Sequence, residues 1–131
     1  MKPSNEKVRL LTDEALELIA ARFRALSEPS RLKLIRELLG GELSVTELME
    51  RTGLGQANTS RHLQTLTDAG ILGRRKEGLR VIYFVGDPGI LTLCEHVCGS
   101  IQRRHASQAA VLAPVLKKTR TAVAPARTNR L

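Results

Sequence analysis

The stretch from residue 44 to residue 72 constrains the fold most, because it contains two short helices together with their start and stop signals. Ser44 and Glu47 have the spacing of a capping box, in which the serine accepts from an amide and the glutamate reaches back. This spacing predicts a helix of about two turns that ends near Gly53. A second helix follows and ends before Gly70, which has the position expected of a left-handed residue after a helix.

The second of these helices is polar at its front and apolar at its back. Its polar part lies within residues 55–66, and Leu63 and Leu66 are three residues apart on one side. A short helix, a tight glycine turn and a second helix with a polar front form a helix-turn-helix, here over about residues 44–69. The leucines would hold the second helix to its body, and its polar front could enter a DNA major groove.

A basic hairpin follows directly, over about residues 71–86. Residues 80–85 are rich in β-branched and aromatic side chains, and a glycine turn precedes them. A hairpin in this place is the wing of a winged helix-turn-helix. The candidate DNA contacts on the helix and the wing are polar or basic side chains: Gln56, Asn58, Ser60, Arg61, His62, Gln64, Arg74, Arg75, Lys76 and Arg80.

Longer helices flank this unit. Residues 13–26 have apolar side chains at helical spacing, and Pro29 permits a new helix that runs to the Gly40-Gly41 break. The expected buried stripe of that helix is Leu32, Ile35, Leu38 and Leu39. After Asp87-Pro88, a cap followed by a proline, a long helix should run over about residues 88–113.

The chain therefore reads as one mainly α domain with a small β-hairpin. We expect an N-terminal arm over residues 1–12, a winged helix-turn-helix domain over 13–113 and a basic, disordered tail over 114–131. The chain has 131 residues, and only three of them are aromatic, so the core must be aliphatic. No apolar run is long enough to span a bilayer, and with two cysteines there is no disulfide framework. We expect a cytoplasmic location.

Charge alone says little about partners. The net charge is +8, but five basic residues and no acidic one lie from Lys117 onward. The first 116 residues then hold 16 basic and 13 acidic side chains, so a solvated basic tail explains most of the excess. The tail could still add salt-sensitive affinity for DNA.

Three classes of function compete at this point. An enzyme is not indicated, because the sequence has no nucleophile–base set, no carboxylate pair and no phosphate-binding loop. A winged helix that binds a protein remains open, but such a wing should expose apolar residues, and this one carries Arg74-Arg75-Lys76. A DNA-binding regulator is preferred.

Three stretches also resemble the ArsR/SmtB family of small winged-helix repressors: ALSEPSRLKLIRELL, SVTELMERTGLGQANTSRHLQTLTDAGIL and GRRKEGLRVIYFV. The resemblance implies a homodimer, joined by its first and last helices, that binds a palindromic double-stranded DNA operator and is released by an inducer. The recognition helix would be residues 56–68. His62 would face DNA, although it could instead pack against the wing. Thr59 stands where the family usually has an apolar residue and would be partly buried.

The inducer is not implied, because the family's sensor motifs are broken in this chain. The Cys-x-Cys element of the arsenic and cadmium sensors is missing from residues 42–48. The zinc and nickel pattern is broken at Cys94-Glu-His96, and the early cysteine of the thiol-redox branch does not exist. Cys94, Cys98 and His105 would share a stripe of the last helix. They could bind a soft metal ion or arsenite or be oxidised, or the cysteines could be small buried hydrophobes without any cofactor.

Overall fold

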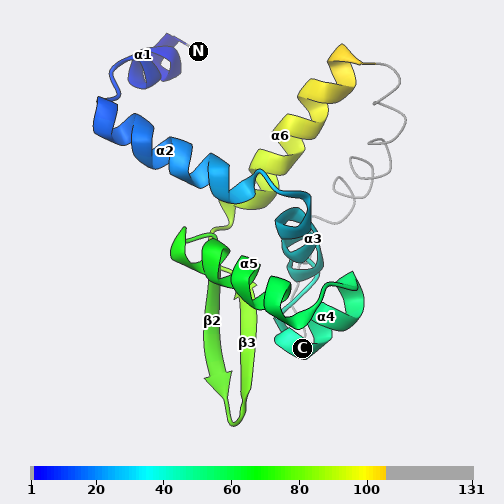
Figure 1. Ribbon diagram of the computed structural model, residues 1–131. Coiled ribbons are helices and arrows are strands. Elements are labelled where there is room, and N and C mark those ends of the chain that lie inside the picture. The colour runs from blue at the N-terminus through cyan, green and yellow to red at the C-terminus, as the bar shows by residue number, and fades with distance from the viewer. Residues whose placement is uncertain (1, 106–131) are drawn as a thin grey trace.

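The computed structural model describes residues 2–105 (Figure 1). Within this range the chain forms six helices and three strands, in the order α1 (Lys2–Arg9), α2 (Asp13–Leu26), α3 (Pro29–Leu38), β1 (Leu43–Ser44), α4 (Val45–Thr52), α5 (Gln56–Asp68), β2 (Leu72–Glu77), β3 (Arg80–Val85) and α6 (Gly89–Arg104). The predicted helix-turn-helix, wing and flanking helices are thus confirmed. No helix among the described residues is long and apolar enough to cross a membrane.

The capping box that predicted the helix-turn-helix forms the expected hydrogen bonds in the structure. The Ser44 side chain accepts from the Glu47 amide at 3.2 Å, and the Glu47 carboxylate accepts from the Ser44 amide at 2.8 Å. Gly53 follows α4 and Gly70 follows α5, both in the left-handed region with φ of 75° and 78°. This backbone conformation is disfavoured for residues that carry a Cβ. The two glycines therefore fix where the helices end.

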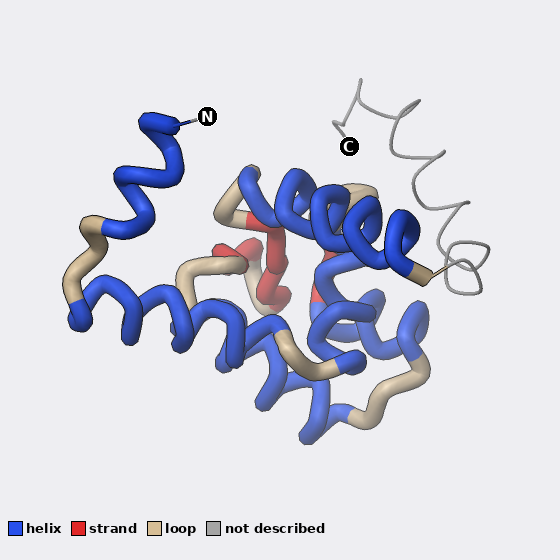
Figure 2. The backbone as a smooth tube through the Cα atoms, turned by 90° about the horizontal axis from the view of Figure 1, so that it is seen from above, coloured by secondary structure: helices blue, strands red, loops and turns tan. Residues whose placement is uncertain are grey.

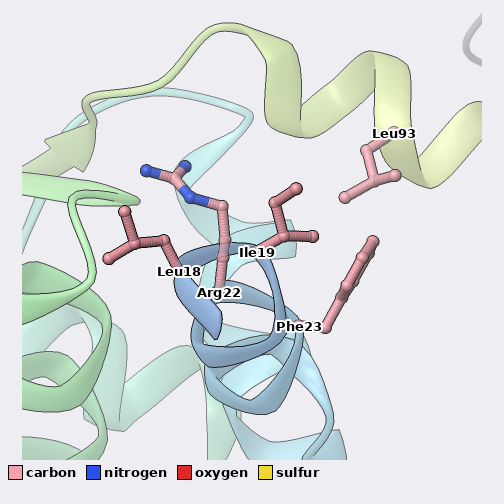
Figure 3. Close-up of a pocket in the computed structure, with 5 residues that line it drawn as sticks. All are labelled: Leu18, Ile19, Arg22, Phe23 and Leu93. Atoms are coloured by element: carbon pink, nitrogen blue, oxygen red, sulfur yellow. The ribbon is translucent and has the colours of Figure 1, made fainter. Parts of the chain in front are cut away.

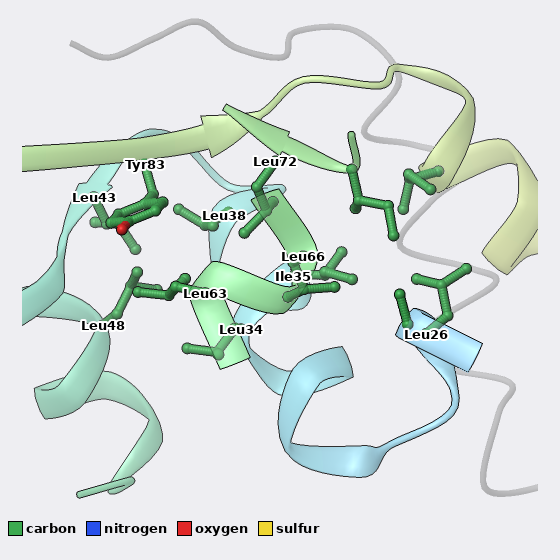
Figure 4. Packing of buried hydrophobic residues seen from close by; sticks show 13 residues of the cluster. Leu26, Leu34, Ile35, Leu38, Leu43, Leu48, Leu63, Leu66, Leu72 and Tyr83 are labelled. Carbon is green, nitrogen blue, oxygen red and sulfur yellow. The ribbon is translucent and has the colours of Figure 1, made fainter. Parts of the chain in front are cut away.

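The core is aliphatic apart from Tyr83, and it joins α3, α4 and α5 to the sheet (Figure 4). Leu34, Leu48, Leu63 and Leu66 are fully buried in it. The predicted stripe of α3 was partly wrong, since Leu32 is 42% exposed and Leu39 37% exposed, whereas Leu34 is buried. The helix turns its Leu34–Ile35 edge to α4 and α5, so the inward face is rotated by part of a turn from the predicted one.

The sheet has one strand more than the predicted hairpin. β2 and β3 pair antiparallel, and β1 pairs with the other edge of β3, so that Leu43 lies opposite Tyr83. Figure 1 shows the hairpin projecting from the body in the direction opposite to α2 and α6. The wing therefore lies at one end of the molecule and the two long helices at the other.

The flanking segments differ from the prediction at both ends. Residues 2–9 of the predicted arm form α1, which lies apart from the rest of the chain in both views (Figures 1 and 2). α6 ends at Arg104, and His105 has an extended backbone, so the helix is shorter than predicted. The remainder of the predicted helix, to residue 113, and the tail over 114–131 lie outside the described residues.

Candidate nucleic-acid interface

The exposed face of α5 carries most of the predicted contacts. Five of its polar side chains are exposed to solvent: Gln56, Asn58, Ser60, Arg61 and Gln64. The opposite face is buried, with Leu63 and Leu66 in the core. The helix thus presents amide, hydroxyl and guanidinium groups outward from a fixed apolar base, and these groups can pair with base edges or phosphates. Gln64 also donates to Asp68 at 2.7 Å, four residues on.

His62 does not lie on this exposed face. Its ring is only 7% exposed and is turned toward α3, where Nδ1 lies 3.3 Å from the Arg31 guanidinium and Nε2 lies 3.8 Å from the Glu28 carboxylate. The expectation of a DNA-side role was therefore wrong in this structure. His62 comes three residues after buried Thr59 and four before buried Leu66, so it shares their side of the helix.

Thr59 is more deeply buried than predicted. Its side chain has no exposed area, and its hydroxyl oxygen has no hydrogen-bond partner within the described part of the chain. This confirms the expectation that Thr59 packs inward. The contact of α5 with the body is thus made by two polar side chains as well as by leucines.

The wing brings four basic side chains to the surface, and carboxylates hold two of them. Arg75 lies 2.7 Å from Glu42 and 2.7 Å from Glu77, and its guanidinium carbon is 6.0 Å from the centre of the Phe84 ring. These hydrogen bonds, first to Glu77 and then to Glu42, raise the pKa of Arg75. Arg80 lies 3.4 Å from Glu47.

Arg74 and Lys76 occupy the other face of β2. They lie opposite Tyr83 and Val81, whereas Arg75 lies opposite Ile82. Side chains on a strand alternate between its two faces, so Arg75 is separated from the other two cations. Both Arg74 and Lys76 are exposed. The wing therefore has one cationic face and one face whose charge carboxylates already balance.

The sequence analysis did not identify the acidic partners of the wing, nor Glu28 and Arg31, which contact the buried side of α5. Glu42 precedes β1, and Glu47 belongs to α4, so they meet the hairpin only through the pairing of β1 with β3. No local sequence pattern indicates such contacts. The only available signal for Glu28 and Arg31 was their place in the stretch that carries the family resemblance.

The predicted sensor residues do not come together as a metal site. Cys94 and Cys98 are free thiols on α6 and are half-buried, and Cys94 packs against the apolar core. Burial, followed by the neighbouring Cys98 and Glu95, raises the pKa of the Cys94 thiol. His105 is exposed and follows the last residue of the helix, so the argument from helical spacing does not extend to it. Among the described residues, no group of three or more histidine, cysteine or acidic side chains could hold a metal ion.

The long helices leave a large apolar surface uncovered. On α2, Leu16, Leu18 and Phe23 are 48%, 74% and 53% exposed, and on α6 Val97 is 48% exposed. A hollow of about 240 Å³ lies between the two helices, lined by Leu18, Ile19, Arg22, Phe23 and Leu93 (Figure 3). Several exposed apolar side chains beside an apolar hollow are typical of an interface.

Comparisons with known proteins agree with this geometry. Residues 28–73 match the family model described as "Bacterial regulatory protein, arsR family". The chain is 42% identical over 71 residues to the probable mercury resistance operon repressor of Streptomyces lividans, a match that covers 54% of this chain and 57% of that repressor. It is 30% identical over 104 residues to the transcriptional regulator NmtR of Mycobacterium tuberculosis, covering 74% of this chain and 87% of NmtR.

Among solved structures, the chain is similar to the homodimeric winged helix-turn-helix DNA-binding domain of a possible ArsR-family regulator from Mycobacterium bovis. The TM-score is 0.64 at 25% identity, and the match covers 73% of this chain and 94% of that domain.

Proposed function

This chain belongs to the ArsR family of bacterial regulatory proteins, and from that premise we propose that it is a homodimeric repressor of a palindromic operator. The family consists of regulators of transcription, so the chain is a DNA-binding regulator and not an enzyme. The observation that carries the proposal is the exposed polar face of α5 beside a cationic wing. Its site of action would be the cytoplasm, where operator DNA is accessible.

The two parts of the interface would have different tasks. Gln56 and Asn58 can pair with adenine, and Arg61 can pair with guanine or a phosphate. Ser60 suits a phosphate oxygen, which fixes the register of the protein without reading sequence. Arg74 and Lys76 would contact the backbone beside the groove that α5 enters. The sequence preference then comes from α5, and the wing supplies affinity.

The dimer would form through the apolar faces of α2 and α6. Their exposed leucines, Phe23 and Val97 would be buried if the same surface of a second copy packed against them. The structural neighbour from Mycobacterium bovis is homodimeric. With one α5 in each protomer, the two half-sites should be spaced by about one turn of DNA, with contacts in successive major grooves.

The inducer would act at the thiols of α6. The names of two relatives refer to mercury and cadmium resistance, and thiolates are suitable ligands for soft metal ions. Cys94 and Cys98 are four residues apart on a helix that would lie at the dimer interface, so the partner's residues could complete a site. The alternative is that both cysteines are only packing residues, which the contact of Cys94 with the core supports.

DNA binding is tested by a fluorescence-anisotropy titration of the reduced protein. One labelled duplex carries the chain's own upstream promoter, and a second has the same composition in scrambled order. We expect at least about a thousandfold preference for the promoter at physiological salt. Equal affinity for the two duplexes would contradict the proposal, and a footprint over a single half-site would contradict the dimer.

The same titration, repeated with arsenite, zinc, cadmium or a thiol oxidant, tests the inducer. Wild type is compared with the double variant Cys94→Ser/Cys98→Ser. If one agent releases DNA from wild type and not from the variant, the thiols are the sensor. If DNA stays bound with every agent, the cysteines are packing residues and control lies elsewhere.

A further inference from the structure

One side chain at the start of α3 joins three helices. The Arg31 guanidinium donates from Nε to the Ala25 carbonyl at 2.6 Å and from Nη2 to the Arg24 carbonyl at 3.2 Å. Its third nitrogen, Nη1, lies 3.3 Å from Nδ1 of His62. Arg24 and Ala25 belong to the last turn of α2, and His62 belongs to α5. A single planar group therefore connects the end of α2 to the recognition helix.

Arg31 adds donors to two carbonyls in the last turn of α2. The residue four positions after Ala25 is Pro29, which has no N–H to donate to the Ala25 carbonyl, whereas the Arg24 carbonyl also accepts from the Ser27 amide at 3.2 Å. The C-terminal end of a helix also favours a cation. Arg31 supplies both the donors and the charge. Its donors are fixed in one plane, so the position of the α2 carbonyls determines where Nη1 can lie.

The contact with α5 defines the protonation state of His62. A guanidinium can only donate, so Nδ1 of His62 must accept and the neutral ring carries its proton on Nε2. Nε2 lies 3.8 Å from Oε1 of Glu28, which already accepts from the Ser30 amide at 2.9 Å. The ring is thus held as an acceptor toward Arg31, in a site with little access to water.

We propose that Arg31 and His62 are positioning residues that fix the angle of the recognition helix α5 relative to α2. The inference rests on the proposed function, in which α2 belongs to the dimer interface and α5 reads DNA. In a dimer, the angle of each α5 to its own α2 sets the spacing and tilt of the two reading helices. We call the contacts of Arg31 with α2 and with His62 the link. The link would therefore control whether both recognition helices fit their half-sites at once.

The link has a built-in dependence on pH. The pKa of His62 is lowered below 6.5, first by burial and also by the charges of Arg31 and Arg61, while Glu28 opposes the shift. A proton on Nδ1 would turn the acceptor into a donor that faces a guanidinium. Because the folded-state pKa is depressed, the link is intact above pH 6.5 and is lost as the pH falls through the lowered pKa.

The pH dependence of operator binding tests this, because its expected sign is unusual. Gaining positive charge on acidification normally strengthens DNA binding. We expect instead that the full-length wild type loses operator affinity at constant salt as the pH falls from 7.5 through the lowered pKa of His62. The loss should reach about tenfold once the ring is protonated, the scale of a hydrogen bond to a charged group. The matched variant is His62→Asn, whose Oδ1 can accept from Arg31 and does not titrate. Its affinity should be the same across this pH range.

A second comparison uses two arginines of α3. Arg31→Lys keeps the charge, but one ammonium cannot serve three acceptors in the same plane. It should lower the ratio of operator to scrambled-DNA affinity about tenfold, while circular dichroism and sedimentation show a folded dimer. The control is Arg36→Ala, which removes an exposed cation whose contact is with the adjacent Glu37. It should leave that ratio within about threefold, because among the described residues the Arg36 guanidinium bonds only to Glu37 of the same helix.

The possible outcomes distinguish a failure of the link from a failure of the proposed function. If wild type shows no preference for operator DNA, the proposed function fails. If wild type binds specifically but does not lose affinity on acidification, the link is wrong. It is equally wrong if Arg31→Lys folds and discriminates like wild type. Should Arg31→Lys fail to fold, the comparison of wild type with His62→Asn decides alone.

Discussion

The Arg22 guanidinium lies 2.5 Å from one oxygen of the Asp87 carboxylate, and the other oxygen accepts from the Gly89 amide at 2.9 Å. One carboxylate therefore both caps the first turn of α6 and pairs with α2. Arg22 also lines the hollow, together with Leu18, Ile19, Phe23 and Leu93 (Figure 3). The pair thus fixes the relative position of the two helices that would form the dimer.

The two roles of Asp87 can be separated by substitution. Asp87→Asn keeps an oxygen for the cap and removes the charge, and should lower the free energy of unfolding by less than about 1 kcal/mol, because the pair is partly exposed. Asp87→Ala also removes the cap and should cost about 1 kcal/mol more. Urea unfolding at one fixed protein concentration measures both, since a dimer's stability depends on concentration. Equal losses in the two variants would show that the cap contributes nothing.

Gly73 leaves room for the Phe84 ring on the wing. A Cβ at this position would collide with Cε1 of Phe84, which is paired opposite it on β3. Gly73→Ala should therefore displace the ring and destabilise the domain by about 1–3 kcal/mol. The measurement is thermal or urea unfolding, and the double variant Gly73→Ala/Phe84→Leu should recover part of the loss. A fully stable single variant would mean that the ring moves at no cost.

The two faces of the wing should differ in their contribution to DNA binding. If Arg74 neutralises one phosphate, Arg74→Ala should lower the slope of log affinity against log salt by about 0.9. Arg75→Ala should lower it less, because Glu42 and Glu77 already balance that charge. Anisotropy titrations at several salt concentrations give both slopes. A larger change for Arg75→Ala would mean that the carboxylates release Arg75 when DNA binds.

Cys94 should react slowly with alkylating reagents. Burial raises the pKa of its thiol, so little thiolate is present at neutral pH, and the thiolate is the nucleophile. In the Cys98→Ser variant, iodoacetamide labelling of Cys94 at pH 7 should be slower than labelling of a free cysteine peptide, and should speed up with rising pH. Labelling faster than that of the peptide would contradict the raised pKa of the Cys94 thiol.

Local signals predicted the helix-turn-helix well, and contacts between distant residues account for what was missed. The capping box at Ser44 and the glycines at 53 and 70 act within one or two turns, so the sequence displays them directly. β1 has two residues and exists only because it pairs with β3, which no local pattern reveals. The outlines of the wing and the long helices came from periodicity and turn residues in the same way.

The sequence predicted which residues lie on the recognition helix, but not the direction in which each side chain points. His62 is polar and lies between exposed Arg61 and buried Leu63, so its chemistry favoured the outer face. The structure turns it inward because Arg31 and Glu28 provide partners there. Both partners belong to α3 and its cap, about 30 residues earlier in the chain, and only the packing of α5 on α3 brings them near. A polar residue beside a buried one cannot be assigned to a face without that packing.

The most direct test of the central claim is the affinity of Arg61→Ala for the promoter duplex, measured by anisotropy beside wild type and Arg36→Ala. Arg61 is exposed at the centre of the α5 face, whereas Arg36 carries the same charge on α3. If α5 reads DNA, Arg61→Ala should lose about 1–3 kcal/mol of binding free energy with unchanged thermal stability, and Arg36→Ala should bind like wild type. An Arg61→Ala variant that binds the promoter as tightly as wild type would place the recognition surface elsewhere on the molecule.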